Sequence, residues 1–142
     1  MLNGVAEPTN SAITRDQAAW DAGGVALPTE DEWFKAAFFD PDLNAGDGGY
    51  WLYPIKSNDL DTSDATFNTS GTKNVGFYGT KPSAYTTYDQ AGNVQEWCEL
   101  ITGTSSEARL VRGGHWATAN VESQIRKMES DFRDSGLLPN TR

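Results

Sequence analysis

The chain has 142 residues, of which 37% are hydrophobic and 22% charged, a profile that predicts one domain with its own core and excludes a disordered chain. Its net charge of -9 would repel a phosphate backbone, so we expect no nucleic-acid partner. The single Cys and single His exclude an intramolecular disulfide, a Cys-pair metal site and a His-rich zinc site within the chain.

Glycine and aromatic residues are abundant, with 14 Gly, 5 Trp, 5 Tyr and 6 Phe, which predicts much irregular backbone held by large rings. No apolar run approaches the roughly 18 residues of a membrane span. Residues 1–8 carry neither a basic start nor an apolar stretch, so they are not a signal peptide. Localisation stays open, and export remains an alternative if the natural N-terminus is longer.

Two helices are predicted near the N-terminus. The first covers 16–22 and ends at Gly23-Gly24, because glycine favours helix C-termini. The second begins after Thr29, which forms a capping box with Glu32, and it should stop at Asp40-Pro41. One face of this helix collects the apolar side chains Trp33, Ala36 and Ala37.

The rest of the chain is predicted to consist of long loops and short strands. Residues 42–87 are punctuated by Gly and Pro, and we expect the aromatic stretches 50–54 and 75–78 to anchor these loops by burial. Gly92-Asn93 indicates a turn followed by a strand. A further short strand covers 110–112.

Several single residues have a structural interpretation. Cys98 is expected to be a buried, inert thiol rather than a reactive one. Aromatic core rings are expected at Trp33, Trp51, Trp97 and Trp116. Four acids without an acid–base partner are expected to be capping or solvent-exposed residues, and they are Asp31, Glu32, Asp40 and Asp42.

Three segments, in this order, resemble the formylglycine-generating enzyme, or sulfatase-modifying factor, domain family. They are 27–37 (LPTEDEWFKAA), 88–98 (YDQAGNVQEWC) and 111–116 (VRGGHW). The resemblance treats 1–142 as one domain and is strongest over 25–139. It implies an α+β domain of the C-type-lectin-like fold with little regular secondary structure.

The resemblance also implies that the domain is incomplete at both ends. Family members have a longer N-terminal part and finish with a further Gly-Phe-Arg strand. Without these parts, strand edges and apolar faces would be exposed, so we expect a fragment or a chain completed by another subunit.

Catalytic members of the family hold copper(I) between two cysteine thiolates, soft ligands that suit this ion. The matching positions here are Thr118 and Ser123, and His115 stands where the family has a serine near its oxygen pocket. Hydroxyls cannot replace thiolates for copper(I). We therefore expect no catalytic residue at these degenerate positions and no bound copper.

Calcium is the metal that the resemblance leaves open. In the family it binds at the segment that corresponds to 93–96, where Asn93 and Glu96 offer side-chain oxygens and Val94 a carbonyl. The alternative is that Asn93 adopts a left-handed turn and Glu96 pairs with an arginine. Both interpretations are kept.

The segment after Trp116 lines the pocket in the family and forms the variable ligand surface in its retroelement-diversified members. It is small and polar here and holds no nucleophile triad. The predicted ligand surface comprises His115, Trp116, Thr118, Asn120, Ser123 and Arg126.

Three functions are compatible with these observations. The first is a non-catalytic module that binds a protein or a small ligand and is stabilised by calcium. The second is an oxidase of the formylglycine-generating type, which would oxidise a protein cysteine with copper. The third is a structural subunit of a larger assembly. The missing cysteine pair favours the first.

Overall fold

The computed structural model describes residues 17–101, 108–119 and 131–134. Its elements are short and follow in the order α1 (Gln17–Asp21), α2 (Glu30–Phe38), β1 (Phe39–Asp40), η1 (Asn44–Gly46), β2 (Gly49–Tyr50), β3 (Glu96–Ile101), β4 (Ala108–Arg112) and β5 (Asp131–Asp134). Most of the described chain is loop. The expected α+β fold with little regular secondary structure is confirmed.

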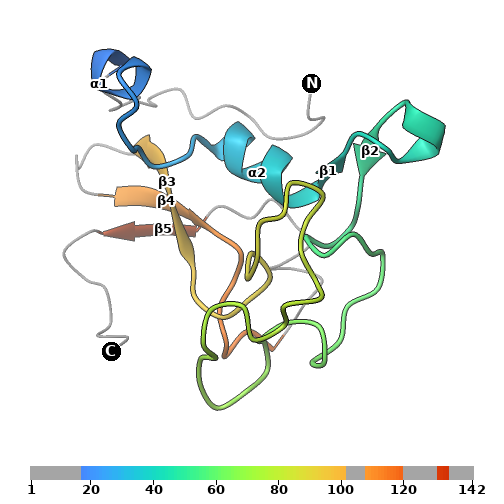
Figure 1. The fold of residues 1–142 in the computed structure, drawn as a ribbon. Helices are drawn as coiled ribbons and strands as arrows, with labels where there is room; N and C mark the ends of the chain where they lie inside the picture. Colours follow the sequence, from blue (N-terminus) through green and yellow to red (C-terminus); the bar gives the residue numbers. More distant parts are fainter. Residues whose placement is uncertain (1–16, 102–107, 120–130, 135–142) are drawn as a thin grey trace.

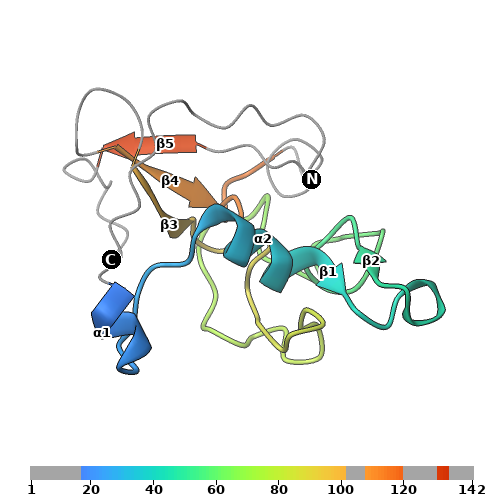
Figure 2. The same ribbon diagram turned by 90° about the horizontal axis from the view of Figure 1, so that it is seen from above.

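The strands form two separate antiparallel sheets. β1 pairs with β2 in a two-stranded sheet, with Phe39 opposite Tyr50. The other sheet has the order β3-β4-β5, and β3 carries an irregularity between Trp97 and Ile101. Figures 1 and 2 show the three-stranded sheet on one side of α2, the two-stranded sheet on the other, and the long loops away from both.

The capping box predicted for α2 is present. The Thr29 N–H donates to the Glu32 carboxylate at 2.8 Å, and the Glu32 N–H donates to the Thr29 hydroxyl at 3.2 Å. The helix ends at Phe38, before Pro41, because Phe39 adopts an extended conformation and begins β1. Local spacing therefore predicted where this helix begins more closely than where it ends.

The short first helix is also confirmed within the described residues. The Gly24 N–H donates to the Ala19 carbonyl oxygen at 2.9 Å, which closes the last turn. Gly23 has a φ of +86°, a left-handed conformation that glycine adopts without a steric penalty.

The core consists of two clusters. The helix–sheet cluster joins α2 to β3 and β4 and contains Trp33, Ala37, Phe38, Cys98 and Leu110. The loop cluster contains Tyr53, Ile55, Ala65, Phe67 and Ala91. The first cluster depends on elements that the sequence predicts, and the second depends on loops that fold back on each other.

Some burial predictions were wrong. Of the four tryptophans expected in the core, Trp33 is buried, whereas Trp51, Trp97 and Trp116 are half-buried. Ala36, which was expected on the buried face of α2, is also half-buried. Phe38 of the same helix is buried instead.

Asp40 is the other correction. It was expected to face solvent, but it lies at the edge of the core. It accepts hydrogen bonds from the Trp51 indole at 2.9 Å and from the Asp42 N–H at 3.0 Å. These bonds, with the Trp51 bond first, hold the pKa of Asp40 below its ordinary value.

Candidate ligand-binding site

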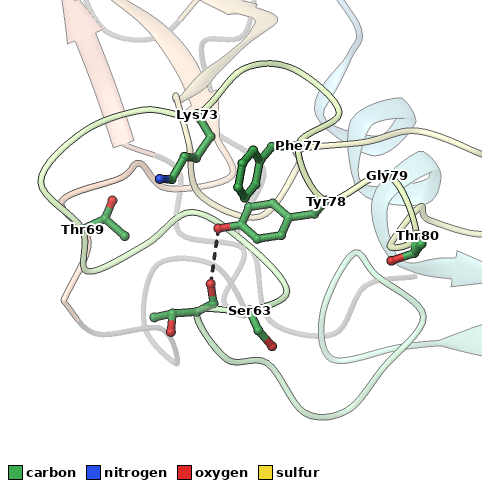
Figure 3. Close-up of a pocket in the computed structure, with 8 residues that line it drawn as sticks. Ser63, Thr69, Lys73, Phe77, Tyr78, Gly79 and Thr80 are labelled. Carbon is green, nitrogen blue, oxygen red and sulfur yellow. Dashed lines mark hydrogen bonds between the residues drawn. The ribbon is translucent and has the colours of Figure 1, made fainter.

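The loops of residues 62–80 enclose an open cavity of about 690 Å³, which we call the Lys73 cavity (Figure 3). Its volume lies within the range of about 300–1,000 Å³ typical of small-molecule sites. The lining residues are Thr62, Ser63, Thr69, Lys73, Phe77, Tyr78, Gly79 and Thr80. Lys73 is the only charged residue among them, and five others carry hydroxyl groups, so the cavity offers one positive charge and several hydrogen-bonding groups.

Aromatic rings organise this cavity. The Lys73 ammonium lies 5.2 Å from the centroid of the Phe77 ring, a distance at which the cation is attracted to the ring face. Phe77 and Tyr78 pack edge to face with centroids 5.0 Å apart. The Tyr78 hydroxyl donates to the Thr62 carbonyl oxygen at 3.3 Å (Figure 3). These contacts connect the two sides of the loop across the cavity.

The side chain of Asn93 holds the loop at Lys73. Its side-chain oxygen accepts from the Lys73 N–H at 3.0 Å, and its side-chain amide donates to the Lys73 carbonyl oxygen at 3.2 Å. Its backbone N–H donates to the Thr66 oxygen at 2.7 Å, and its carbonyl oxygen accepts from the Trp116 N–H at 3.0 Å. One residue thus joins three segments that are far apart in sequence.

The backbone of this turn has little room for side chains. Asn93 has a φ of +61°, and Gly92 before it has a φ of +74°. A Cβ at Gly92 would lie 2.1 Å from the Thr66 carbonyl oxygen, which is closer than any real contact. The predicted turn at Gly92-Asn93 is confirmed, and the left-handed conformation weighed for Asn93 is present.

The segment 115–118 closes into a compact turn beside the cavity. The Thr118 hydroxyl accepts from the His115 N–H at 3.0 Å, and the Thr118 N–H donates to the His115 oxygen at 2.9 Å. The Thr69 N–H donates to the Trp116 carbonyl oxygen at 2.9 Å. Because Thr69 lines the Lys73 cavity, part of the predicted ligand surface adjoins it.

The predicted ligand surface is only partly described. His115 and Trp116 are half-buried, with ring centroids 6.3 Å apart, and the Nδ1 of His115 accepts from the Ala117 N–H. Thr118 is buried. Asn120, Ser123 and Arg126 lie outside the described residues.

The three residues suggested as calcium ligands point to different neighbours. Asn93 contacts Lys73, as above, whereas Glu96 accepts a hydrogen bond from the Trp33 indole at 2.5 Å. Val94 is exposed. Across the described residues, no three His, Cys, Asp or Glu side chains gather as a metal site would require.

Cys98 lies on β3 with none of its surface exposed. Burial raises the pKa of its thiol to about 12, and the nearby Glu96 carboxylate adds to this effect. The thiolate is the form that binds metal and attacks electrophiles, so the burial and the raised pKa of Cys98 agree with the expected unreactive thiol. With the Thr118 hydroxyl already hydrogen-bonded, these residues do not fit copper(I).

Sequence reasoning missed the residues of the Lys73 cavity. The stretch 75–78 was expected to anchor a loop by burial, but Val75 and Phe77 are 88% and 60% exposed. In the first aromatic stretch, Tyr53 is buried as expected, whereas Tyr50 is exposed. The sequence feature that could have indicated the cavity is Lys73 followed four residues later by Phe77 and Tyr78. This spacing does not predict a cavity unless the conformation of the loop is known.

The profile of the sulfatase-modifying factor enzyme 1-like domain matches residues 11–138. The chain therefore belongs to this family, and the resemblance drawn from the three segments is confirmed.

Two curated relatives carry the name serine/threonine-protein kinase pkn1. The chain is 36% identical over 110 residues to the protein of Chlamydia caviae and 40% identical over 110 residues to that of Chlamydia pneumoniae. The match covers 66% of this chain but only 16% of each relative. The chain thus corresponds to a small part of these longer proteins.

Two solved structures share the fold. Variable protein 1 of Treponema denticola superposes with a TM-score of 0.55 at 25% identity, over 82% of this chain and 44% of that protein. CarF superposes with a TM-score of 0.56 at 24% identity, over 79% of this chain and 42% of that protein. The fold is thus that of the family, as the resemblance implied. Within the described part, no helix is long and apolar enough to cross a membrane.

Proposed function

We propose that this domain is a non-catalytic binding module of the sulfatase-modifying factor family, and that its ligand occupies the Lys73 cavity. The observation that supports the loss of catalysis is at Thr118. This residue occupies a position where the family's oxidases carry a copper-binding cysteine, and its hydroxyl accepts the His115 N–H. The single cysteine of the chain is buried on β3 and keeps its proton.

The chemistry of the cavity favours a small polar ligand with an anionic group. Lys73 supplies a positive charge, which is attracted to the Phe77 ring face. The surrounding hydroxyl groups donate and accept hydrogen bonds. The Lys73 N–H donates to the Asn93 side-chain oxygen, and the Lys73 carbonyl oxygen accepts from the Asn93 side-chain amide. The backbone at Lys73 is therefore held before a ligand binds, and less ordering of this residue is needed on binding.

The loss of catalysis is tested by a copper(I) titration combined with a turnover assay on a cysteine-containing peptide of the sulfatase type. The natural sequence should neither bind copper tightly nor form formylglycine. By the family resemblance, the double variant Thr118→Cys/Ser123→Cys should bind copper(I) at least about a hundredfold more tightly. Turnover by the natural sequence would overturn the proposal.

The binding role is tested by calorimetric titration with glucuronate, and with glucose as its neutral analogue. Glucuronate should bind, and Lys73→Met should weaken it about tenfold, which corresponds to about 1.4 kcal/mol. Lys35→Met is the matched control, because Lys35 also lies over an aromatic ring, 5.7 Å from the Phe39 centroid, but outside the cavity. Equal loss in both variants would argue against this site.

Calcium is kept as a separate proposal. Asn93 and Glu96 supply hard oxygen atoms of the kind that calcium prefers, and a bound ion would stabilise the turn that supports Lys73. Calorimetry with Ca²⁺ on the natural chain and on Asn93→Ala should show binding heat only for the former. Identical heats would contradict it.

A role as an interaction module within a longer protein has one observation in its favour. The chain matches only 16% of each pkn1 relative, so in those proteins the domain accompanies other parts. Association with another subunit is the corresponding proposal here. Sedimentation of the purified chain tests it, and a monomer that melts cooperatively would argue against it.

A further inference from the structure

A second cavity, which we call the Glu96 cavity, lies between α1, α2 and the segment 87–96. Its volume is about 470 Å³. It shares no lining residue with the Lys73 cavity, so a ligand there would occupy a separate site, although it would share Glu96 with the calcium site proposed above.

Three aromatic side chains line this cavity, and they are Trp20 of α1, Trp33 of α2 and Tyr88. Trp20 is 43% exposed and Tyr88 is 41% exposed, so both rings are accessible to a ligand. Trp33 is 4% exposed and belongs to the helix–sheet cluster, which gives the cavity one rigid wall. Aromatic rings in this number are typical of sites that bind apolar or cationic groups.

Two carboxylates distinguish between these two kinds of ligand. Glu96 and Glu32 both line the cavity, and none of its described lining residues is basic. The Glu96 carboxylate is held by the Trp33 indole, and Glu32 is held by the Thr29 N–H of the capping box. Each carboxylate is thus oriented by a hydrogen bond.

The burial of Glu96 favours a positive ligand. Glu96 is half-buried, and one of its carboxylate oxygens accepts the hydrogen bond from the Trp33 indole. An ionised Glu96 in this position lacks part of its hydration. A cation that enters beside it would replace the lost solvation, whereas an anion would be repelled by the carboxylates of Glu96, Glu32 and Asp89.

We propose that the Glu96 cavity binds an alkylammonium group, with the Trp20, Trp33 and Tyr88 rings around its methyl or methylene groups and the Glu96 carboxylate as its counter-ion. A quaternary or methylated ammonium suits these walls because it is weakly hydrated and attracted to aromatic rings. The three rings and the two acids come from three segments, α1, α2 and 87–96, and only the folded chain brings these segments together.

The first experiment compares choline with 3,3-dimethylbutan-1-ol, a neutral molecule of nearly the same shape, by NMR or calorimetric titration of the whole chain. Choline should bind at least about fivefold more tightly than the neutral molecule, as expected for a cation against aromatic rings and a carboxylate. Equal affinity would mean a merely apolar cavity and would overturn the proposal, as would no binding of either molecule.

The variants Tyr88→Leu and Glu96→Gln test whether choline binds in the Glu96 cavity. Each should weaken choline about fivefold, whereas Tyr50→Leu, which replaces another exposed tyrosine, should leave the affinity unchanged. Because Tyr88 is exposed, its variant should fold. Unchanged choline affinity in Tyr88→Leu would overturn the assignment. Glucuronate binding at the Lys73 cavity serves as an independent readout and should not change.

A further pair of ligands identifies the source of the group. A short peptide with one trimethyl-lysine that binds more tightly than choline would support a protein partner as the source. Tighter binding of choline would support a free small molecule. If the peptide and choline both bind no better than an unmodified alanine peptide, the proposal fails.

Discussion

The Lys73 cavity and the Glu96 cavity are opposite in charge and in construction. The first is formed by a loop, carries one lysine among hydroxyl groups, and is held by backbone hydrogen bonds to Asn93. The second is formed around two helices and carries two acids among aromatic rings. The hydrogen bond that connects its walls joins two side chains, the Trp33 indole and the Glu96 carboxylate. An acidic protein can thus present a local positive site when a loop brings a single lysine to an aromatic ring.

Both cavities depend on one short stretch of chain, 90–96. Asn93 supports Lys73, whereas Gln90 and Glu96 line the second cavity. Gly92 belongs to the same stretch and donates its N–H to the Gly113 oxygen at 2.7 Å. Variants of this stretch should therefore distinguish features that the cavities share from features that belong to one of them.

The largest effect is expected for Gly92→Ala. The added Cβ would meet the Thr66 oxygen at 2.1 Å, and the φ of +74° is itself strained for alanine. We expect a loss of about 4 kcal/mol in the free energy of unfolding, measured by urea denaturation, and damage to both cavities.

Gly76→Ala is the matched control for Gly92→Ala. Gly76 has the same φ of +74° and nothing within 4 Å of an added Cβ. It should lose only the conformational part, about 1–2 kcal/mol. Equal losses in the two variants would show that the contact with Thr66 is unimportant.

The next effect concerns the ion pair between Glu30, at the start of α2, and the buried Arg112 of β4. Glu30→Gln would leave the guanidinium buried without its carboxylate and should cost about 3 kcal/mol. Because α2 carries Trp33, choline binding should weaken more than glucuronate binding. Asp31→Asn, at an exposed position in the same turn, should cost less than about 1 kcal/mol. Unfolding curves of the two variants that coincide would contradict this interpretation.

A smaller effect, confined to the Lys73 cavity, is expected for Asn93→Gly. Glycine tolerates the φ of +61°, so the variant removes the two side-chain hydrogen bonds to Lys73 without adding strain. We expect a loss of about 2 kcal/mol and weaker glucuronate binding. Asn93→Asp, which keeps the acceptor, should lose about half as much. Unchanged glucuronate affinity in Asn93→Gly would separate Asn93 from the cavity.

The smallest effect is expected for Glu96→Gln, and it depends on pH. Because burial raises the pKa of Glu96 above its ordinary value of 4.5, the folded state holds the proton to a higher pH than the unfolded chain. The favourable contribution present at acid pH is lost as the pH rises through the folded pKa. The variant should therefore melt about 2 °C higher at pH 7, with no gain below the ordinary value.

The two effects expected for Glu96→Gln have opposite signs. Glu96→Gln should stabilise the protein at neutral pH while it weakens choline binding. A carboxylate that costs stability but binds a ligand is typical of a functional site. A variant that both destabilises the protein and leaves choline binding unchanged would make Glu96 a purely structural partner of Trp33.

Features that depend on local spacing could be predicted from the sequence alone. The capping box of α2, the turn at Gly92-Asn93 and the short strand around Leu110 follow from residues a few positions apart. The family could also be predicted from the order of three segments, and by that resemblance Thr118 and Ser123 stand where the family's oxidases carry copper-binding cysteines.

The positions of the two cavities, in contrast, depend on contacts between residues far apart in sequence. Asn93 and Lys73 are 20 residues apart, and Trp33 and Glu96 are 63 residues apart. Such pairs depend on how long loops close, and the propensity of single residues does not encode loop closure. For this reason Asn93 could be predicted as a turn residue or a metal ligand, but its role as the support of Lys73 became visible only in the fold.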